Sequence, residues 1–163
     1  MIEASHRPSA RIWRLIACVG VSFVPAIVGG RFGPGAWYAA LEKPALTPPG
    51  WVFPIAWTAL YLAMGVALFL FLDGTARRDG ARRWGTGLFA AQLVLNGAWS
   101  WLFFGLERPD LALVDIVALW ALIAATMVAF ARRRGAAAAL LAPYLAWVSF
   151  ATYLNFEIWR LNG

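Results

Sequence analysis

The sequence is poor in the residues that carry most catalytic and metal chemistry. Charged residues make up 13% of the 163 positions, and there is one histidine and one cysteine. His6 lies in the N-terminal tail, and the single Cys18 excludes an intrachain disulfide framework. No cluster of histidine, cysteine and carboxylate residues has metal-ligand spacing, and no glycine-rich phosphate loop or nucleophile elbow is present. We therefore expect no metal site and no required cofactor.

Apolar residues dominate what is present. They account for 62% of the chain, and the mean hydropathy is +0.68. A soluble domain of this length cannot bury so much apolar surface. Because no long polar stretch could form a second unit, we expect one membrane domain over residues 1–163.

The spacing of charged residues predicts how often the chain crosses the membrane. A helix that crosses the hydrocarbon needs about 20 mostly apolar residues. Five segments meet this requirement, at approximately residues 12–30, 51–72, 84–106, 111–131 and 136–158. A cleaved signal peptide is the alternative for the first segment, but Pro25 and the length of the run oppose it. The predicted fold is an all-α membrane protein with a five-transmembrane-helix bundle.

The basic residues predict how this bundle lies in the membrane. With five spans, the N-terminus, the second loop and the fourth loop share one side of the membrane. Ten basic residues fall on that side: Arg7, Arg11, Arg14, Arg77, Arg78, Arg82, Arg83, Arg132, Arg133 and Arg134. Four fall on the other: Arg31, Lys43, Arg108 and Arg160. The positive-inside rule then places the N-terminus in the cytoplasm, and the C-terminus and first loop outside. We expect the membrane to belong to a bacterial envelope. The formal charge of +6 indicates contact with anionic lipid and gives no support for a nucleic-acid partner.

The connector between the first two spans is the longest in the chain. Residues 31–50 contain several prolines and glycines, which cannot sustain one long helix. A long structured loop in a compact protein is usually functional. Because Trp37 and Tyr38 make this loop partly amphipathic, we interpret it as a lid on the outer face.

Aromatic and amide residues recur at helical spacing on three of the spans. The stripes comprise Pro54, Trp57, Tyr61 and Gly65 on the second span, Gln92, Asn96, Trp99 and Phe103 on the third, and Tyr144, Trp147, Ala151 and Asn155 on the fifth. Three such faces could enclose an aromatic cavity suited to a flat macrocycle or a sterol-like body. The alternative is ordinary helix packing, with the amides forming hydrogen bonds between helices.

Several of these segments resemble a known family. The motifs are Trp37-Tyr38, Lys43-Pro44, Thr47-Pro48-Pro49, Trp51-Val52-Phe53-Pro54, Trp57-Thr58 and Leu60-Tyr61, followed by Gln92-Leu93 with Asn96 and Trp99, and by Pro143-Tyr144-Leu145-Ala146-Trp147. Val24-Pro25 and Gly29-Gly30 add matches in the first span. Together they resemble the signature of the tryptophan-rich sensory protein family, also called the translocator protein or peripheral benzodiazepine receptor family.

The resemblance implies a five-helix bundle, commonly a homodimer, whose pocket opens beneath the first loop. Members bind porphyrins or haem, cholesterol-like sterols, and isoquinoline carboxamide or benzodiazepine ligands. It implies polar contacts from Trp57 and Asn96, walls from Trp99 and Trp147, and a lid carrying Trp37 and Tyr38. With the stripes and the loop motif, the predicted ligand-binding residues are Trp37, Tyr38, Pro48, Trp51, Trp57, Tyr61, Asn96, Trp99, Phe103, Tyr144, Trp147 and Ala151.

Two departures and three functional classes complete the prediction. The proline-rich loop has Ala45 and Leu46 where many members carry an aromatic residue, and Phe156 replaces the tyrosine of a sterol motif.

A receptor or sensor of tetrapyrroles needs only the pocket. The alternatives are a porphyrin transporter, although no inverted repeat is visible, and a light- and oxygen-dependent porphyrin-degrading enzyme that uses Trp57 and Trp147. Small residues Gly87, Ala90, Ala91 and Gly97 predict close approach of another helix to the third span.

Overall fold

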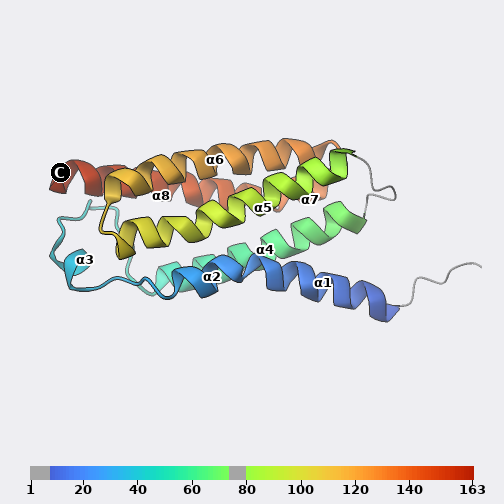
Figure 1. The fold of residues 1–163 in the computed structure, drawn as a ribbon, viewed down its shortest axis with the longest axis horizontal. Coiled ribbons are helices and arrows are strands. Elements are labelled where there is room, and N and C mark those ends of the chain that lie inside the picture. Colours follow the sequence, from blue (N-terminus) through green and yellow to red (C-terminus); the bar gives the residue numbers. More distant parts are fainter. Residues whose placement is uncertain (1–7, 74–79) are drawn as a thin grey trace, which may run out of the picture.

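The computed structural model describes residues 8–73 and 80–163, and within these ranges the backbone is helical without strands. The elements are α1 (Pro8–Ser22), α2 (Val24–Gly29), α3 (Ala36–Ala40), α4 (Val52–Asp73), α5 (Gly80–Ser100), η1 (Trp101–Gly105), α6 (Pro109–Ala131), α7 (Gly135–Ala139) and α8 (Ala142–Asn162). They form an elongated bundle whose long helices run side by side (Figure 1). His6, Arg7, Arg77 and Arg78, which the sequence analysis used, lie outside the described residues.

Among the residues that the structure describes, five helical segments are long and apolar enough to cross a membrane, so the predicted all-α class and five spans are confirmed. The segments are Ala10–Gly29, Val52–Asp73, Gly80–Gly105, Pro109–Ala131 and Gly135–Asn162. The third begins four residues before the predicted boundary, and the fifth continues four residues beyond it, because the arginine and tryptophan side chains at these helix ends can reach the polar interface. The chain is an integral membrane protein.

Two of the spans are interrupted by proline. Pro25 cannot donate a backbone hydrogen bond, and the first span breaks at Phe23, between α1 and α2. The Ser22 hydroxyl donates to the Cys18 carbonyl at 2.9 Å just before the break. In the fifth span, Pro143 stands in the first turn of α8, which begins after a break at Leu140 and Leu141.

The third span ends in a π-helical turn, η1. Its wider winding is marked by the Leu106 N–H, which donates to the Trp101 carbonyl five residues back at 2.8 Å. π turns inside α-helices are frequent at functional sites, because the extra residue redirects the side chains that follow. Here the turn carries Phe103 and Phe104, and a tight connection then leads into α6.

Glycines allow the close approaches that hold the bundle together. A Cβ at Gly65 of α4 would lie 2.5 Å from the Val19 Cα of α1, so the two helices touch through their backbones. A Cβ at Gly97 of α5 would lie 3.7 Å from the Pro25 Cα of α2, which is ordinary contact distance. Gly97, one of the small residues expected to admit another helix, is thus already occupied by α2 of the same chain.

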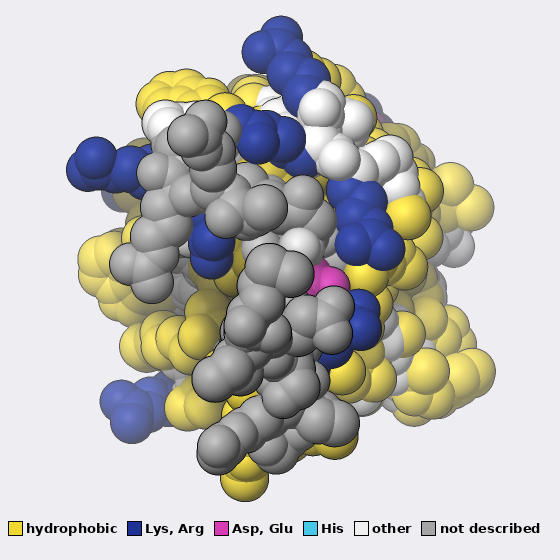
Figure 2. Space-filling view, turned by 90° about the vertical axis from the view of Figure 1, so that its right-hand side faces the viewer, with side chains coloured by type: hydrophobic (Ala, Val, Ile, Leu, Met, Phe, Trp, Pro, Cys, Tyr) yellow, Lys and Arg dark blue, Asp and Glu magenta, His cyan; other side chains and the backbone are white. Residues whose placement is uncertain are grey.

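The two ends of the bundle differ in charge. Where α1 begins and α4 ends, Arg11 and Arg14 pair with Asp73 at 3.0 and 3.6 Å. Figure 2 views this end, where arginine side chains are spread around the described surface. The loop that contains α3 and the C-terminal end of α8 both lie at the opposite end (Figure 1).

Candidate ligand-binding site

Two adjoining cavities lie between the helices near the end of the bundle that the first loop covers. The larger has a volume of about 580 Å³ and the smaller about 320 Å³. Both are in the range of small-molecule sites. Their shared lining residues are Phe53, Pro54, Trp57, Trp99, Ser100 and Ala151, from α4, α5 and α8. The cavities therefore act as two lobes of one site, with Trp57 and Trp99 in the wall between them.

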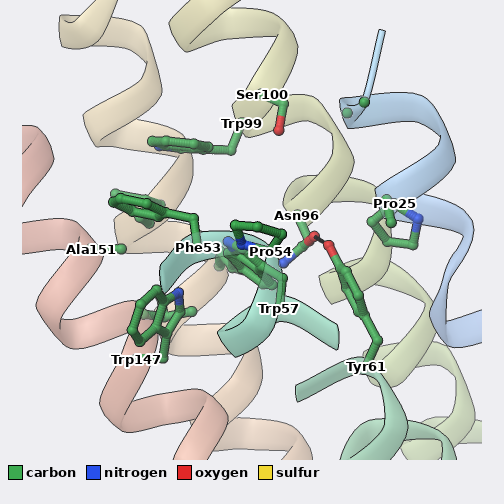
Figure 3. A pocket seen from close by; sticks show the side chains of 16 residues that line it. Pro25, Phe53, Pro54, Trp57, Tyr61, Asn96, Trp99, Ser100, Trp147 and Ala151 are labelled. Carbon is green, nitrogen blue, oxygen red and sulfur yellow. Dashed lines mark hydrogen bonds between the residues drawn. The ribbon is translucent and has the colours of Figure 1, made fainter. Parts of the chain in front are cut away.

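The end of the first span lines the smaller cavity and packs closely on α5. Pro25, Gly29 and Gly30 form one wall, and a Cβ at Gly29 would lie 2.7 Å from the Ser100 hydroxyl. In Figure 3, Phe53 and Trp147 stand on the far side of Trp57 from Asn96 and Tyr61. The cavity is thus aromatic on one side and polar on the other.

The larger cavity lies beneath the first loop. Tyr38, Lys43 and Pro48 of that loop line it, opposite Phe103 and other residues of the helices. The Tyr38 ring meets Phe103 edge-on, with the ring centroids 6.2 Å apart. Burial raises the pKa of Tyr38 above its ordinary value, so its hydroxyl stays neutral. The loop thus contributes a neutral aromatic ring to the lining of the cavity.

The polar side of the smaller cavity is a chain of three buried residues from three helices. The Tyr61 hydroxyl donates to Asn96 Oδ1 at 2.7 Å, and Asn96 Nδ2 donates to the Tyr144 hydroxyl at 2.9 Å. Trp57 stacks on Tyr61 at 5.3 Å and meets Tyr144 edge-on at 6.2 Å. These two hydrogen bonds fix the orientation of Tyr61 and Tyr144, which the Trp57 indole contacts. They leave one amide hydrogen of Asn96 for a ligand.

Trp99 is held by a separate hydrogen bond. Its indole N–H donates to Asn155 Oδ1 at 2.9 Å, and Asn155 Nδ2 donates to the Pro109 carbonyl at 2.8 Å. Asn155 is 1% exposed, so water does not compete for these bonds. Trp99 also stacks on Phe103 at 4.9 Å. Its ring is therefore fixed in the wall that both cavities share.

The remaining hydrogen-bond donors are few. Within the described residues, the indole N–H groups of Trp57 and Trp147 have no protein partner, and each faces a cavity. Lys43 is the only charged residue among the described residues that line either cavity. Gln92, one turn from Asn96, is fully buried, and its amide atoms have no protein partner. The arrangement suits a flat apolar molecule with a small number of hydrogen-bond acceptors.

The structure separates the predicted site residues into two groups. The residues that line one or both cavities are Tyr38, Pro48, Trp57, Tyr61, Asn96, Trp99, Phe103, Trp147 and Ala151. Three others do not. Tyr144 is fully buried behind Asn96, Trp37 packs against Phe103 with the ring centroids 5.7 Å apart, and Trp51 is 67% exposed. Trp51 belongs to the loop motif, whose pattern does not say which way each ring points.

Several lining residues were not predicted. Leu154 and Ile158 line the larger cavity and follow Ala151 at i+3 and i+7, so the stripe on α8 could have been extended to include them. Phe53 precedes Trp57 by four residues and Ser100 follows Asn96 by four, so helical spacing could also have included them. Gly29 and Gly30 line the smaller cavity through their lack of side chains, which a search for functional groups overlooks.

Comparison with known proteins shows the family of the chain. The TspO/MBR family pattern matches residues 15–160. The chain is 47% identical over 155 residues to the tryptophan-rich protein TspO of Chlorobaculum tepidum, covering 93% of this chain and 98% of that protein. It is 42% identical to the tryptophan-rich sensory protein of Cereibacter sphaeroides, covering 85% and 84%. It is 40% identical to the human translocator protein, covering 90% of each. The chain belongs to the TspO/MBR family.

Proposed function

We propose that this protein is a membrane receptor or sensor that binds tetrapyrroles, such as porphyrin or haem, in the two adjoining cavities. Sterol-like, isoquinoline carboxamide and benzodiazepine molecules are the other ligand classes that the site would accept. The protein is proposed to act as a homodimer in a bacterial envelope, with its N-terminus in the cytoplasm and the lid outside. The relatives named sensory protein and translocator protein support a receptor role.

The observation that carries the proposal is the aromatic wall shared by the two cavities. Trp57, Trp99 and Phe53 reach both lobes, so a flat ring system can lie against them without a metal or an ion pair. The free indole N–H groups of Trp57 and Trp147 and the remaining hydrogen of Asn96 supply hydrogen bonds to a ligand carbonyl. Such a donor set orients a ligand and leaves it chemically unchanged, which favours sensing.

Protoporphyrin titration in lipid nanodiscs tests the proposal, followed by tryptophan quenching and by porphyrin absorbance in the dark. Loss of aromatic pairing worth about 0.5–1.5 kcal/mol should weaken binding about threefold to tenfold in Trp57→Leu. The matched control is Trp84→Leu, because Trp84 is 68% exposed and lies at the opposite end of the bundle. Equal affinity of both variants and the wild type would refute the site.

A second pair of measurements separates polar from aromatic contacts. Asn96→Leu should weaken a carbonyl-bearing isoquinoline carboxamide about threefold to tenfold, because a neutral hydrogen bond contributes about 0.5–1.5 kcal/mol. Protoporphyrin, held mainly by stacking, should be affected less. Repeating the titration under light tests the enzyme alternative, since porphyrin absorbance would then fall with time in the wild type and not in Trp57→Leu.

A further inference from the structure

The C-terminal end of α8 is hydrogen-bonded to the first loop at a point 120 residues away in the sequence. The Glu42 backbone N–H donates to Asn162 Oδ1, and Asn162 Nδ2 donates to the Glu42 carbonyl, both at 2.9 Å. The side-chain amide thus pairs with the loop as one peptide group pairs with another. Within residues 8–73 and 80–163, these are the only side-chain hydrogen bonds between the loop and helices α5 to α8.

Asn162 is oriented before it meets the loop. Its Nδ2 also donates to the Ile158 carbonyl at 2.8 Å, one turn earlier in α8. Both amide hydrogens are therefore used, one on the helix and one on Glu42. Because the helix fixes the rotamer of Asn162, little side-chain freedom remains to be lost when the loop docks.

The loop segment that Asn162 holds is a compact unit. The Lys43 ammonium group donates to the carbonyls of Ala39 and Leu41, at 3.3 and 3.1 Å, and lies 4.8 Å from the centre of the Tyr38 ring. These contacts link α3 to the residues on either side of Glu42. A force on the Glu42 peptide group therefore acts on Tyr38 and Lys43 together, and both line the larger cavity.

The rest of the loop's contact with the bundle is aromatic. The Tyr38 ring meets Phe103 and Phe104 at 6.2 and 5.4 Å. Such edge contacts tolerate sliding, whereas two hydrogen bonds to one amide specify a single position. Ile158, which orients Asn162 through its carbonyl, has a side chain that lines the same cavity. The hydrogen-bonded pair and the cavity are thus built on the same turn of α8.

We infer that Asn162 is a positioning residue of the ligand site, which holds the first loop closed over the larger cavity and so sets how long a ligand stays bound. This inference rests on the proposed ligand-binding function. Asn162 does not line the cavity, so its effect is on the opening of the loop. Both Glu42 hydrogen bonds are present in the structure without a ligand, so they must break before a ligand enters and again before it leaves. Loss of Asn162 should therefore raise the dissociation rate and the association rate together, and change the affinity less than either rate.

Stopped-flow transfer of protoporphyrin to an excess of a soluble porphyrin-binding apo-protein tests the inference in Asn162→Ala, Asn162→Asp and Phe156→Leu. Loss of two exposed hydrogen bonds should speed dissociation about threefold to tenfold in Asn162→Ala. Asn162→Asp keeps an acceptor for the Glu42 N–H but turns a carboxylate oxygen toward the Glu42 and Ile158 carbonyls, so it should release porphyrin at least as fast as Asn162→Ala. Phe156→Leu is the control, because Phe156 lies on α8, is 41% exposed and has its ring contact with Trp159 of the same helix. Wild-type release from folded Asn162→Ala would overturn the inference.

Hydrogen exchange in the ligand-free protein separates this inference from the proposed function. The Glu42 amide and its neighbours in residues 36–43 should exchange faster in Asn162→Ala, while the amides of α4 and α5 stay as protected as in the wild type. Unchanged exchange at Glu42 would overturn the role of Asn162 even if porphyrin binds. Faster exchange in a protein that binds no porphyrin would support the positioning role and refute the proposed ligand.

Discussion

The buried hydrogen bonds among Tyr61, Asn96 and Tyr144 predict that one tyrosine substitution changes the free energy of unfolding in opposite directions with and without Asn96. Changing Asn96 to leucine removes the amide and keeps a similar volume, so both buried tyrosine hydroxyls lose their partner. Each buried group without a partner costs about 1–3 kcal/mol. We therefore expect Asn96→Leu to lower the free energy of unfolding by about 2–6 kcal/mol. The lower end is favoured because hydrogen bonds between helices in membranes average only about 0.6 kcal/mol.

The tyrosine changes should then have opposite effects in the two backgrounds. In the wild type, Tyr61→Phe or Tyr144→Phe removes one hydrogen bond and should cost about 0.5–1.5 kcal/mol. In Asn96→Leu, the same changes remove a hydroxyl that has no partner, so each should restore about 1 kcal/mol or more. The reversal follows only if Asn96 is the partner of both hydroxyls, as the distances indicate.

Reversible unfolding in mixed micelles with a rising fraction of denaturing detergent, followed by far-UV circular dichroism, measures these free energies. Tyr153→Phe is the control, because Tyr153 is 41% exposed and should be neutral in both backgrounds. If Tyr61→Phe and Tyr144→Phe destabilise both backgrounds equally, the hydroxyls do not depend on Asn96. The reasoning about the polar side of the smaller cavity would then be wrong.

Further predictions test packing, Trp99, topology and association. Gly65→Ala should destabilise the protein by about 1–3 kcal/mol, because the new Cβ would press on α1, whereas the exposed Gly20→Ala should be neutral or stabilising by up to about 1 kcal/mol in the same unfolding assay. Asn155→Leu should cost about 1–3 kcal/mol by leaving the Trp99 indole N–H without a partner. A C-terminal alkaline phosphatase fusion should be active and a green fluorescent fusion dark; the reverse pattern would refute the orientation. Cross-linking in lipid and light scattering in mild detergent should both report a dimer, and a monomer in both would refute the proposed association.

The number of spans could be predicted because it depends on local properties of the chain. Runs of about 20 apolar residues between charges must be helical in a bilayer, since the backbone has no water to bond with. The same local periodicity put Trp57 and Tyr61 on one face of α4, and Asn96 and Trp99 on one face of α5. Pro25 and Pro143 were visible, but their positions alone did not say that each span would break there.

The partners of these side chains were decided by the tertiary structure. Asn96 was expected to offer its amide to a ligand, yet two tyrosines from α4 and α8 already bond to it, because three helices cross at that depth. Trp51 shares the motif of Trp57 but lies just before α4 and is exposed, and the motif alone could not assign the direction of its ring.

The sequence by itself therefore determined the class of the protein, its spans and the faces that carry aromatic rings, because helix formation and membrane insertion depend on residues close together in the chain. Only the tertiary structure decided that the site has two lobes separated by Trp57 and Trp99, and that Asn162 meets Glu42. These features join segments up to 120 residues apart. Their geometry depends on how side chains fill the space between helices, a property that no single segment contains.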